Sequence, residues 1–309
     1  MIKTLKANGH TAARMRRVRS YAKYLYLLPA AALIIGVVGY PVTRAFFLSL
    51  FEYNPLSVGK TFVGLGNYGE ILRDPVFHKA LMNTAIWTFG CVFFQGAFGL
   101  LGAVLLNQHF KGRGVIRGLT LIPWATPSVL AAMMWMWILD GNYGLLNDLL
   151  RRAGLIELPI PWISQTETAL ASLMLIDVWQ GIPFFAVMLL AALQTVSGDL
   201  LEAAKLDGAG PWKAFWNVVF PLILPTLMIT TILRIVWTAS YMDLMLVVTQ
   251  GGPAYSTLTV PLSAYYTAYS NLEFGKATAM ASVQALFLLV FVIVYLKLYG
   301  KRGGFDGGR

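Results

Sequence analysis

The sequence predicts an all-α integral membrane protein with six transmembrane helices. Hydrophobic residues make up 57% of the 309-residue chain and charged residues only 12%, whereas soluble domains carry about 25% charged residues. Long apolar runs separate clusters of Lys and Arg, and the net charge is +10. This composition excludes an ordinary soluble enzyme, a disordered protein and a secreted disulfide scaffold. The one cysteine, Cys91, cannot form an internal disulfide.

Six stretches are long and apolar enough to cross the hydrocarbon core of a bilayer, which takes a helix of about 20 residues. Prolines interrupt most of them, and each proline removes a backbone hydrogen bond, so we expect kinked helices packed in a bundle. The first stretch is far longer than the apolar core of a signal peptide and is expected to be retained. The six spans cover roughly residues 25–51, 80–107, 116–139, 166–195, 221–249 and 276–299.

The basic residues predict the orientation of these spans. Sixteen Lys and Arg residues fall on one side, in the N-terminal tail, the second and fourth connections and the C-terminal end, against six on the other side. The positive-inside rule makes the side with sixteen cytoplasmic, so both termini are expected there. The chain then divides into a basic cytoplasmic tail (1–24), a transmembrane domain (25–300) and a C-terminal tail (301–309). No nucleic-acid reading motif accompanies the basic tail, so we expect no nucleic-acid partner.

The sequence lacks an arrangement of residues for catalysis or metal binding. Its three histidines are far apart and do not have the spacing of metal ligands. Residues 59–61 resemble the end of a phosphate-binding loop, but position 54, where such a loop needs glycine, holds Asn54. We therefore expect a protein that is not an enzyme and has no metal and no cofactor of its own.

The connection between the fourth and fifth spans, residues 198–220, predicts more structure than a simple link needs. Ser197 or Asp199 can cap a helix at its start. Gly208 can end that helix, and Pro211 can open a second short one. Exposed apolar side chains on such a helix pair usually mark a docking site. The side chains expected at the surface are Glu202, Leu206, Trp212 and Phe215.

This connection resembles the coupling loop of ABC importer permeases, whose signature is Glu-Ala-Ala, three residues, Gly, nine residues, Ile, one residue and Leu-Pro. Val218 and Phe220 replace the Ile and Leu of that signature conservatively. Five positions match it at the right spacing: Glu202, Ala203, Ala204, Gly208 and Pro221.

Other segments resemble the sugar-uptake branch of the same family. FVGLGNY (62–68) precedes the second span, Asn83–Thr84 lies at its start, GGP (251–253) follows the fifth span, and FGKATA (274–279) opens the sixth. The resemblance covers roughly residues 25–300. It implies the type I ABC importer permease fold with a cytoplasmic coupling helix, in the bacterial inner membrane.

The resemblance also implies partners and a mechanism. In that family two permeases, here expected as a heterodimer, form the pathway through the lipid membrane above two ATP-binding subunits. Those subunits bind ATP and Mg²⁺, and a periplasmic solute-binding protein delivers a sugar or sugar derivative for import. Carried over, Glu202 pairs with a basic residue of an ATPase subunit, and Gly208 permits the tight turn. The implied coupling residues are Glu202, Ala203, Ala204, Asp207, Gly208 and Pro221.

Polar and aromatic residues on the fourth and fifth spans form a candidate substrate-binding face. Ionisable residues inside a bilayer are costly and suggest a functional site, and on each span these residues follow the i, i+3, i+4, i+7 spacing of one helix face. At about 1.5 Å per residue, the antiparallel spans would place Asp177 level with Tyr241, and Phe184 level with Arg234. The predicted sugar-binding residues are Asp177, Gln180, Gly181, Phe184, Arg234, Trp237, Thr238 and Tyr241.

Several alternatives stay open. Asp177 and Arg234 also fit a plain intramembrane ion pair, Trp237 and Tyr241 also fit packing residues, and the second permease could hold the substrate instead. Arg234 would suit an anionic sugar, because guanidinium binds phosphate and sulfonate well. The amphipathic stretch 144–152 is either a dock for the binding protein or an interfacial helix without a partner. The alternative function is a secondary transporter or channel that works alone, which a structured coupling loop disfavours.

Overall fold

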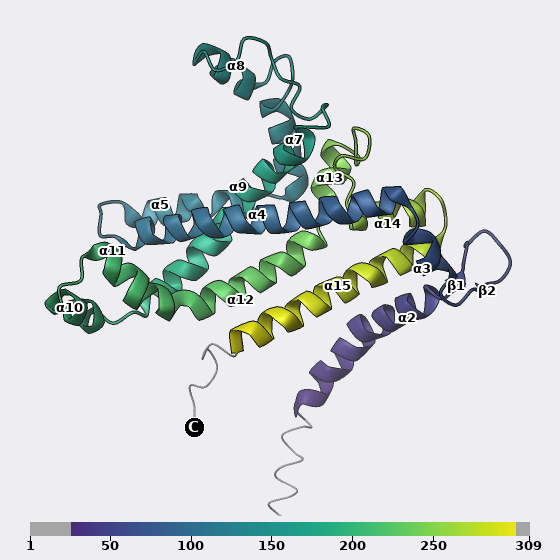
Figure 1. Cartoon of the computed structure of the whole chain (residues 1–309), viewed down its shortest axis with the longest axis horizontal. Helices are drawn as coiled ribbons and strands as arrows, with labels where there is room; N and C mark the ends of the chain where they lie inside the picture. Colours follow the sequence, from purple (N-terminus) through teal and green to yellow (C-terminus); the bar gives the residue numbers. More distant parts are fainter. Residues whose placement is uncertain (1–25, 301–309) are drawn as a thin grey trace, which may run out of the picture.

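The structure, a computed structural model, describes residues 26–300, with side chains up to Lys297. The tails expected over residues 1–24 and 301–309 lie outside these described residues. Long helices run alongside one another, and the coupling loop lies at one end of them (Figure 1). In the described part of the chain, five helices are long and apolar enough to span a membrane, or six if one bent helix pair counts as a single span.

The first span is the helix Tyr26–Leu48, which is π-helical over Ile34–Gly39 (η1) and ends as α2 (Tyr40–Leu48). The predicted span 25–51 is therefore too long at its C-terminal end. Instead Phe51–Glu52 (β1) pairs antiparallel with Thr61–Phe62 (β2). The side-chain amide of Asn67, on α3 (Gly66–Ile71), donates to the carbonyl oxygens of Ser49 and Phe51 at 2.8 and 3.0 Å and holds the chain in this turn.

The second and fourth spans are the long helices α4 (Pro75–Asn107) and α9 (Ala169–Gln194), which pack along each other. Helix α4 begins five residues before the predicted start at 80. The reason is its cap: the Asp74 carboxylate accepts from the Val76 amide at 2.8 Å, and Pro75 occupies the first turn, where a missing N–H costs nothing.

The third predicted span, residues 116–139, is not one continuous helix. It consists of α5 (Arg113–Thr120), α6 (Ile122–Ala125) and α7 (Ser128–Ile138), with a bend of 93° before α7. The break lies at Thr126, whose backbone is extended with ψ 125°, because a following proline disfavours the α conformation. Helix α7 then leads away from the long helices to α8 (Leu145–Arg152) (Figure 1).

The fifth span, Pro211–Val248, begins ten residues before the predicted range 221–249, ends within one residue of it and contains a break. The helical run starts in the coupling loop, where α11 (Pro211–Ala214) continues through the π-helical turn η2 (Phe215–Val219) into α12 (Phe220–Ala239). It stops at residues 240–242, where the amides of Ser240 and Tyr241 bond back only three residues. A separate short helix, α13 (Asp243–Val248), follows.

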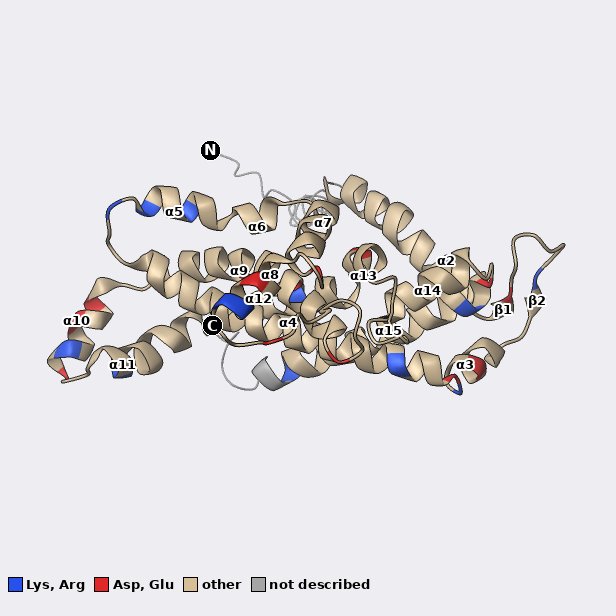
Figure 2. Cartoon of the chain, turned by 90° about the horizontal axis from the view of Figure 1, so that it is seen from above, with Lys and Arg blue, Asp and Glu red and all other residues tan. Residues whose placement is uncertain are grey.

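The chain ends with two helices. Helix α14 (Val260–Tyr269), which the sequence did not predict, packs against α15 (Phe274–Gly300), which covers the sixth predicted span, 276–299. Lys and Arg residues lie at the coupling-loop end, on α5, α10 (Gly198–Leu206) and α11. Others lie near β2 and α3 at the opposite end (Figure 2). Between these ends the helices are largely apolar, so the few polar side chains there stand out.

Candidate functional site

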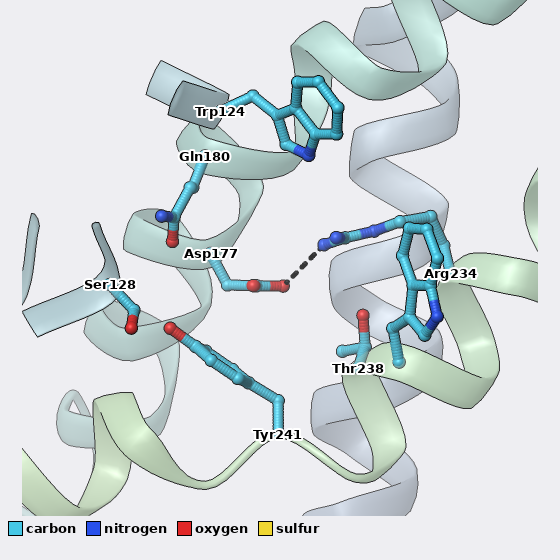
Figure 3. A pocket seen from close by; sticks show the side chains of 8 residues that line it. Trp124, Ser128, Asp177, Gln180, Arg234, Thr238 and Tyr241 are labelled. Carbon is cyan, nitrogen blue, oxygen red and sulfur yellow. Dashed lines mark ion pairs between the residues drawn. The ribbon is translucent and has the colours of Figure 1, made fainter. Parts of the chain in front are cut away.

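A polar pocket of about 190 Å³ lies among α6, α7, α9 and α12. Four separate chain segments build it, and the 93° bend between α6 and α7 brings Trp124 and Ser128 to it together. The side chains converge on one cavity (Figure 3). Its lining residues are Trp124, Ser128, Asp177, Gln180, Arg234, Trp237, Thr238 and Tyr241.

A buried ion pair lies at the centre of this pocket. Asp177 Oδ2 is 3.6 Å from Arg234 Nη2, and both side chains are largely buried (Figure 3). Gln95 of α4, which is fully buried, donates to the Asp177 carboxylate at 2.8 Å and accepts from Arg234 Nε at 2.9 Å. The pair therefore has the additional hydrogen bonds that a charge pair in a low-dielectric site requires.

Two hydroxyl groups in the pocket lack a hydrogen-bond partner. Thr238 Oγ1 and Tyr241 Oη are buried and make no hydrogen bond within the described residues, although the Tyr241 hydroxyl points towards Ser128 (Figure 3). An unpaired buried hydroxyl costs about 1–3 kcal/mol. Such groups inside a pocket are ready to exchange hydrogen bonds with a bound polar molecule.

Aromatic rings border the same pocket. The ring of Phe184 contacts the rings of Trp124 and Trp237, with centroids 6.0 and 5.2 Å apart. Helix α9 carries Gln180 beside them, and its side-chain amide donates at 2.8 Å to the Thr126 carbonyl oxygen at the break between α6 and α7. The broken span is thereby tied to α9, and its tryptophan is held against the pocket.

The structure brings together most of the residues predicted to bind substrate. Six of the eight line the pocket. Phe184 instead supports the two tryptophans, and Gly181 leaves room for the side chains of Gln95 and Arg234. The ion pair joins Asp177 to Arg234, as the alternative of an intramembrane ion pair expected, whereas counting residues had placed Asp177 level with Tyr241, two helical turns further along. Counting residues along a span holds for straight helices, whereas Pro183 lies inside α9 and α12 ends in a break.

Sequence reasoning missed Trp124, Ser128 and Gln95. Two signals pointed to them. Prolines 123 and 127 flank Trp124 within the third span, and broken helices in transport proteins often border a binding site. Gln95 is an amide in an otherwise apolar span, and polar groups at such depth need a partner. The described residues contain no group of three or more His, Cys, Asp or Glu side chains that could hold a metal ion.

The coupling loop has the local structure that its residues predict. Ser197 Oγ caps α10 by accepting from the Asp199 amide at 3.2 Å. At the other end Gly208 adopts φ +79°, and the amides of Gly208 and Ala209 bond back to the carbonyl oxygens of Lys205 and Ala204 at 3.0 and 2.9 Å. This pattern is a Schellman cap, in which glycine avoids the steric cost of a left-handed residue.

The side chains of the coupling loop divide between solvent and the helices. Glu202, Ala203 and Asp207 are exposed, whereas Ala204 is buried. Leu206 is 89% and Trp212 74% exposed. Other members of the loop anchor it: Phe215, expected at the surface, is partly buried against the rings of Trp216 and Phe220, and Pro221 lies in the first turn of α12.

Known proteins resemble this chain along most of its length. Residues 95–301 match the family described as "Binding-protein-dependent transport system inner membrane component". The trehalose/maltose transport system permease protein MalF of Thermococcus litoralis is 35% identical, with 89% of this chain and 92% of that protein covered. The sulfoquinovosyl glycerol transport system permease protein SmoG of Agrobacterium fabrum is 33% identical, with 89% of each covered.

A solved structure shares the fold. A chain of a bacterial ABC transporter involved in the import of the acidic polysaccharide alginate superposes with a TM-score of 0.78 at 18% identity, covering 95% of this chain and 99% of that one. The family match extends over more than half of the chain and includes both the pocket helices and the coupling loop. The match excludes the alternative function of a secondary transporter or channel that works alone. The chain therefore belongs to the family of binding-protein-dependent transport system inner membrane components, and it is a multi-pass permease subunit of an ABC importer rather than an enzyme.

Proposed function

We propose that this permease imports a saccharide and that the saccharide binds in the pocket between α6, α7, α9 and α12. The observation that carries the proposal is the convergence of two unpaired hydroxyls, an ion pair and aromatic rings on one cavity. Sugars present many hydroxyl groups together with flat C–H faces, and these suit polar side chains and aromatic rings respectively. Relatives named for trehalose or maltose and for sulfoquinovosyl glycerol support a saccharide cargo.

The charge of the pocket favours a neutral part of the sugar at this position. Arg234 is already paired with Asp177, so the charges of the two side chains offset each other. An anionic group on the sugar would gain the guanidinium but would also meet the carboxylate beside it. An anionic sugar therefore remains a second candidate, supported by a relative named for sulfoquinovosyl glycerol transport.

A second permease subunit would complete the pocket. Its volume of about 190 Å³ is below the roughly 300–1,000 Å³ of most ligand pockets, so this chain supplies only part of the wall. We place the remaining wall on a second, different permease, giving a heterodimer with the pathway between the subunits. Either subunit can carry most of the sugar contacts, and substitutions in the present pocket decide which one does.

Energy for import would come from two ATPase subunits that bind ATP and Mg²⁺. The coupling loop offers them Glu202 beside exposed apolar side chains, and its other face packs against the ends of α9 and α12. A movement of the loop would thus reach both pocket helices. The sixteen Lys and Arg residues that the sequence assigns to the side of the coupling loop, against six on the other side, support a cytoplasmic coupling loop and cytoplasmic termini in the bacterial inner membrane. A periplasmic binding protein would then dock away from the coupling loop, and α8, which α7 carries away from the long helices, is one candidate contact (Figure 1).

Transport by the complete complex tests this proposal. The permease, its co-purifying partners and the binding protein are reconstituted in proteoliposomes, and uptake of labelled neutral and anionic sugars is measured with the ATP hydrolysis it drives. Tyr241→Phe and Thr238→Val remove the two unpaired hydroxyls and should each lower sugar uptake several-fold, while basal ATP hydrolysis persists. Ser270→Ala, at the end of α14 and outside the pocket, is the matched hydroxyl control. Full uptake by both pocket variants would place the sugar on the other permease.

A further inference from the structure

We propose that Gln95 is a positioning residue: from α4, outside the pocket lining, it orients Arg234 for sugar binding. This inference rests on the proposed function, because it concerns the same pocket. Gln95 is fully buried in the middle of an apolar helix. A buried polar side chain at such a place needs hydrogen-bond partners, because leaving its amide unpaired in the bundle would be costly.

Chemistry permits only one orientation of the Gln95 amide. Its nitrogen donates both hydrogens to Asp177, one to the backbone carbonyl oxygen and one to Oδ2, each at 2.8 Å. Its oxygen accepts from Arg234 Nε at 2.9 Å. A carboxylate cannot donate and a guanidinium cannot accept, so a rotated amide would lose these bonds. Gln95 thereby links α4 to both α9 and α12.

The consequence for Arg234 is a fixed guanidinium plane with its far edge free. Gln95 uses the Nε hydrogen, and the contact of Nη2 with Asp177 is 3.6 Å, longer than a hydrogen bond. Neither terminal nitrogen of Arg234 makes a hydrogen bond within the described residues. The guanidinium extends from α12 into the cavity (Figure 3). The terminal hydrogens that do not face the Asp177 carboxylate can therefore donate to oxygens of a ligand in the cavity.

Gly181 keeps the space that this arrangement needs. A Cβ atom added there would overlap the Gln95 amide and approach Arg234 Nη2 to 2.7 Å. Any larger residue would push the amide or the guanidinium out of place. The fourth span therefore supplies both the carboxylate of Asp177 and, one turn later, the gap in which the other two side chains meet.

Equilibrium binding of labelled sugar to the solubilised permease–ATPase complex tests the inference. The binding protein is left out, so that its own affinity for the sugar does not contribute. Gln95→Leu removes all three hydrogen bonds and should weaken binding by about 10- to 100-fold, as expected for hydrogen bonds to charged groups. In an Arg234→Ala background the same change should cost less than about twofold, because the residue it positions is gone. Thr88→Val, a buried residue two turns earlier on α4, is the matched control and should leave binding unchanged.

An exchange variant separates positioning from simple stabilisation. Gln95→Glu with Asp177→Asn moves the carboxylate to α4 and the amide to α9, which keeps the total charge and an acceptor for Arg234 Nε. This double variant should bind sugar more tightly than Gln95→Leu at comparable thermal stability. Equal losses from Gln95→Leu with and without Arg234 would overturn the inference. Absence of sugar binding in the unaltered complex would instead count against the proposed function.

Discussion

The coupling loop connects α9 to α12, two of the helices that line the pocket, but the loop and the pocket are built in opposite ways. The loop is held by hydrogen bonds between residues a few positions apart, such as Ala209 to Ala204, and its distinctive side chains face outward. The pocket is held by contacts between residues 82 and 139 positions apart, from Gln95 to Asp177 and to Arg234. A change in the loop should therefore affect docking alone, whereas a change in the pocket disturbs packing and binding together.

The largest effect should come from reversing the charge of Glu202. A like-charge contact at an interface costs several kcal/mol, so Glu202→Lys should weaken ATPase docking at least about tenfold and abolish uptake. The thermal stability of the permease should not change, because the Glu202 side chain is exposed. Co-purification of the ATPase and uptake in proteoliposomes measure the two effects. Asp199→Lys on the same helix is the control, and unchanged uptake with Glu202→Lys would refute the coupling role.

The next largest effect should come from breaking the buried ion pair. Asp177→Leu or Arg234→Met alone leaves an unpaired charge in the bundle, which costs about 3–5 kcal/mol of stability. The double variant removes both charges and should recover most of that loss, yet sugar binding should stay much weaker than in the unaltered complex. Thermal unfolding and sugar binding, measured on all three variants, distinguish a structural pair from a binding pair. Recovery of binding in the double variant would show that the pair is only structural.

A smaller effect is expected at Gly181. The added methyl of Gly181→Ala overlaps the Gln95 amide, and overpacking of this kind costs about 1–3 kcal/mol. Sugar binding should fall with stability because the same atoms orient Arg234. Gly102→Ala on α4 is the matched control, since its Cβ would meet only ordinary contact with Ala186 at 3.5 Å. Equal behaviour of the two variants would contradict the tight packing described for Gly181.

The smallest effect is expected at Gly208. A Cβ there meets no neighbour within 4 Å, so the only cost of Gly208→Ala is the left-handed backbone at φ +79°, about 1–2 kcal/mol. The cap should loosen and ATPase docking should weaken several-fold, with sugar binding to the pocket unchanged. Hydrogen exchange of the Ala209 amide reports the cap directly. A loss of sugar binding in this variant would show that loop and pocket are less separate than their construction suggests.

The elements that the sequence predicted well are those with local causes. Ser197 starts α10 and Gly208 ends it, each through groups a few residues away. The prolines predicted kinked helices, and Pro127 accounts for the break of the third span, but neither the 93° bend there nor the break of the fifth span at residues 240–242 was predicted. Apolar periodicity shows that a segment can be buried in a membrane, but not where a helix bends within it.

For the candidate site, the sequence alone indicated the faces of the fourth and fifth spans from which six of the eight predicted residues line the pocket, because helical spacing fixes a face. It also determined the coupling loop, whose signature is continuous in the chain. Only the tertiary structure decided that Asp177 pairs with Arg234, that Gln95 joins them, and that Trp124 and Ser128 enter the pocket. The physical reason is that helix crossing and bending set which turns meet, and those angles arise from packing among distant segments.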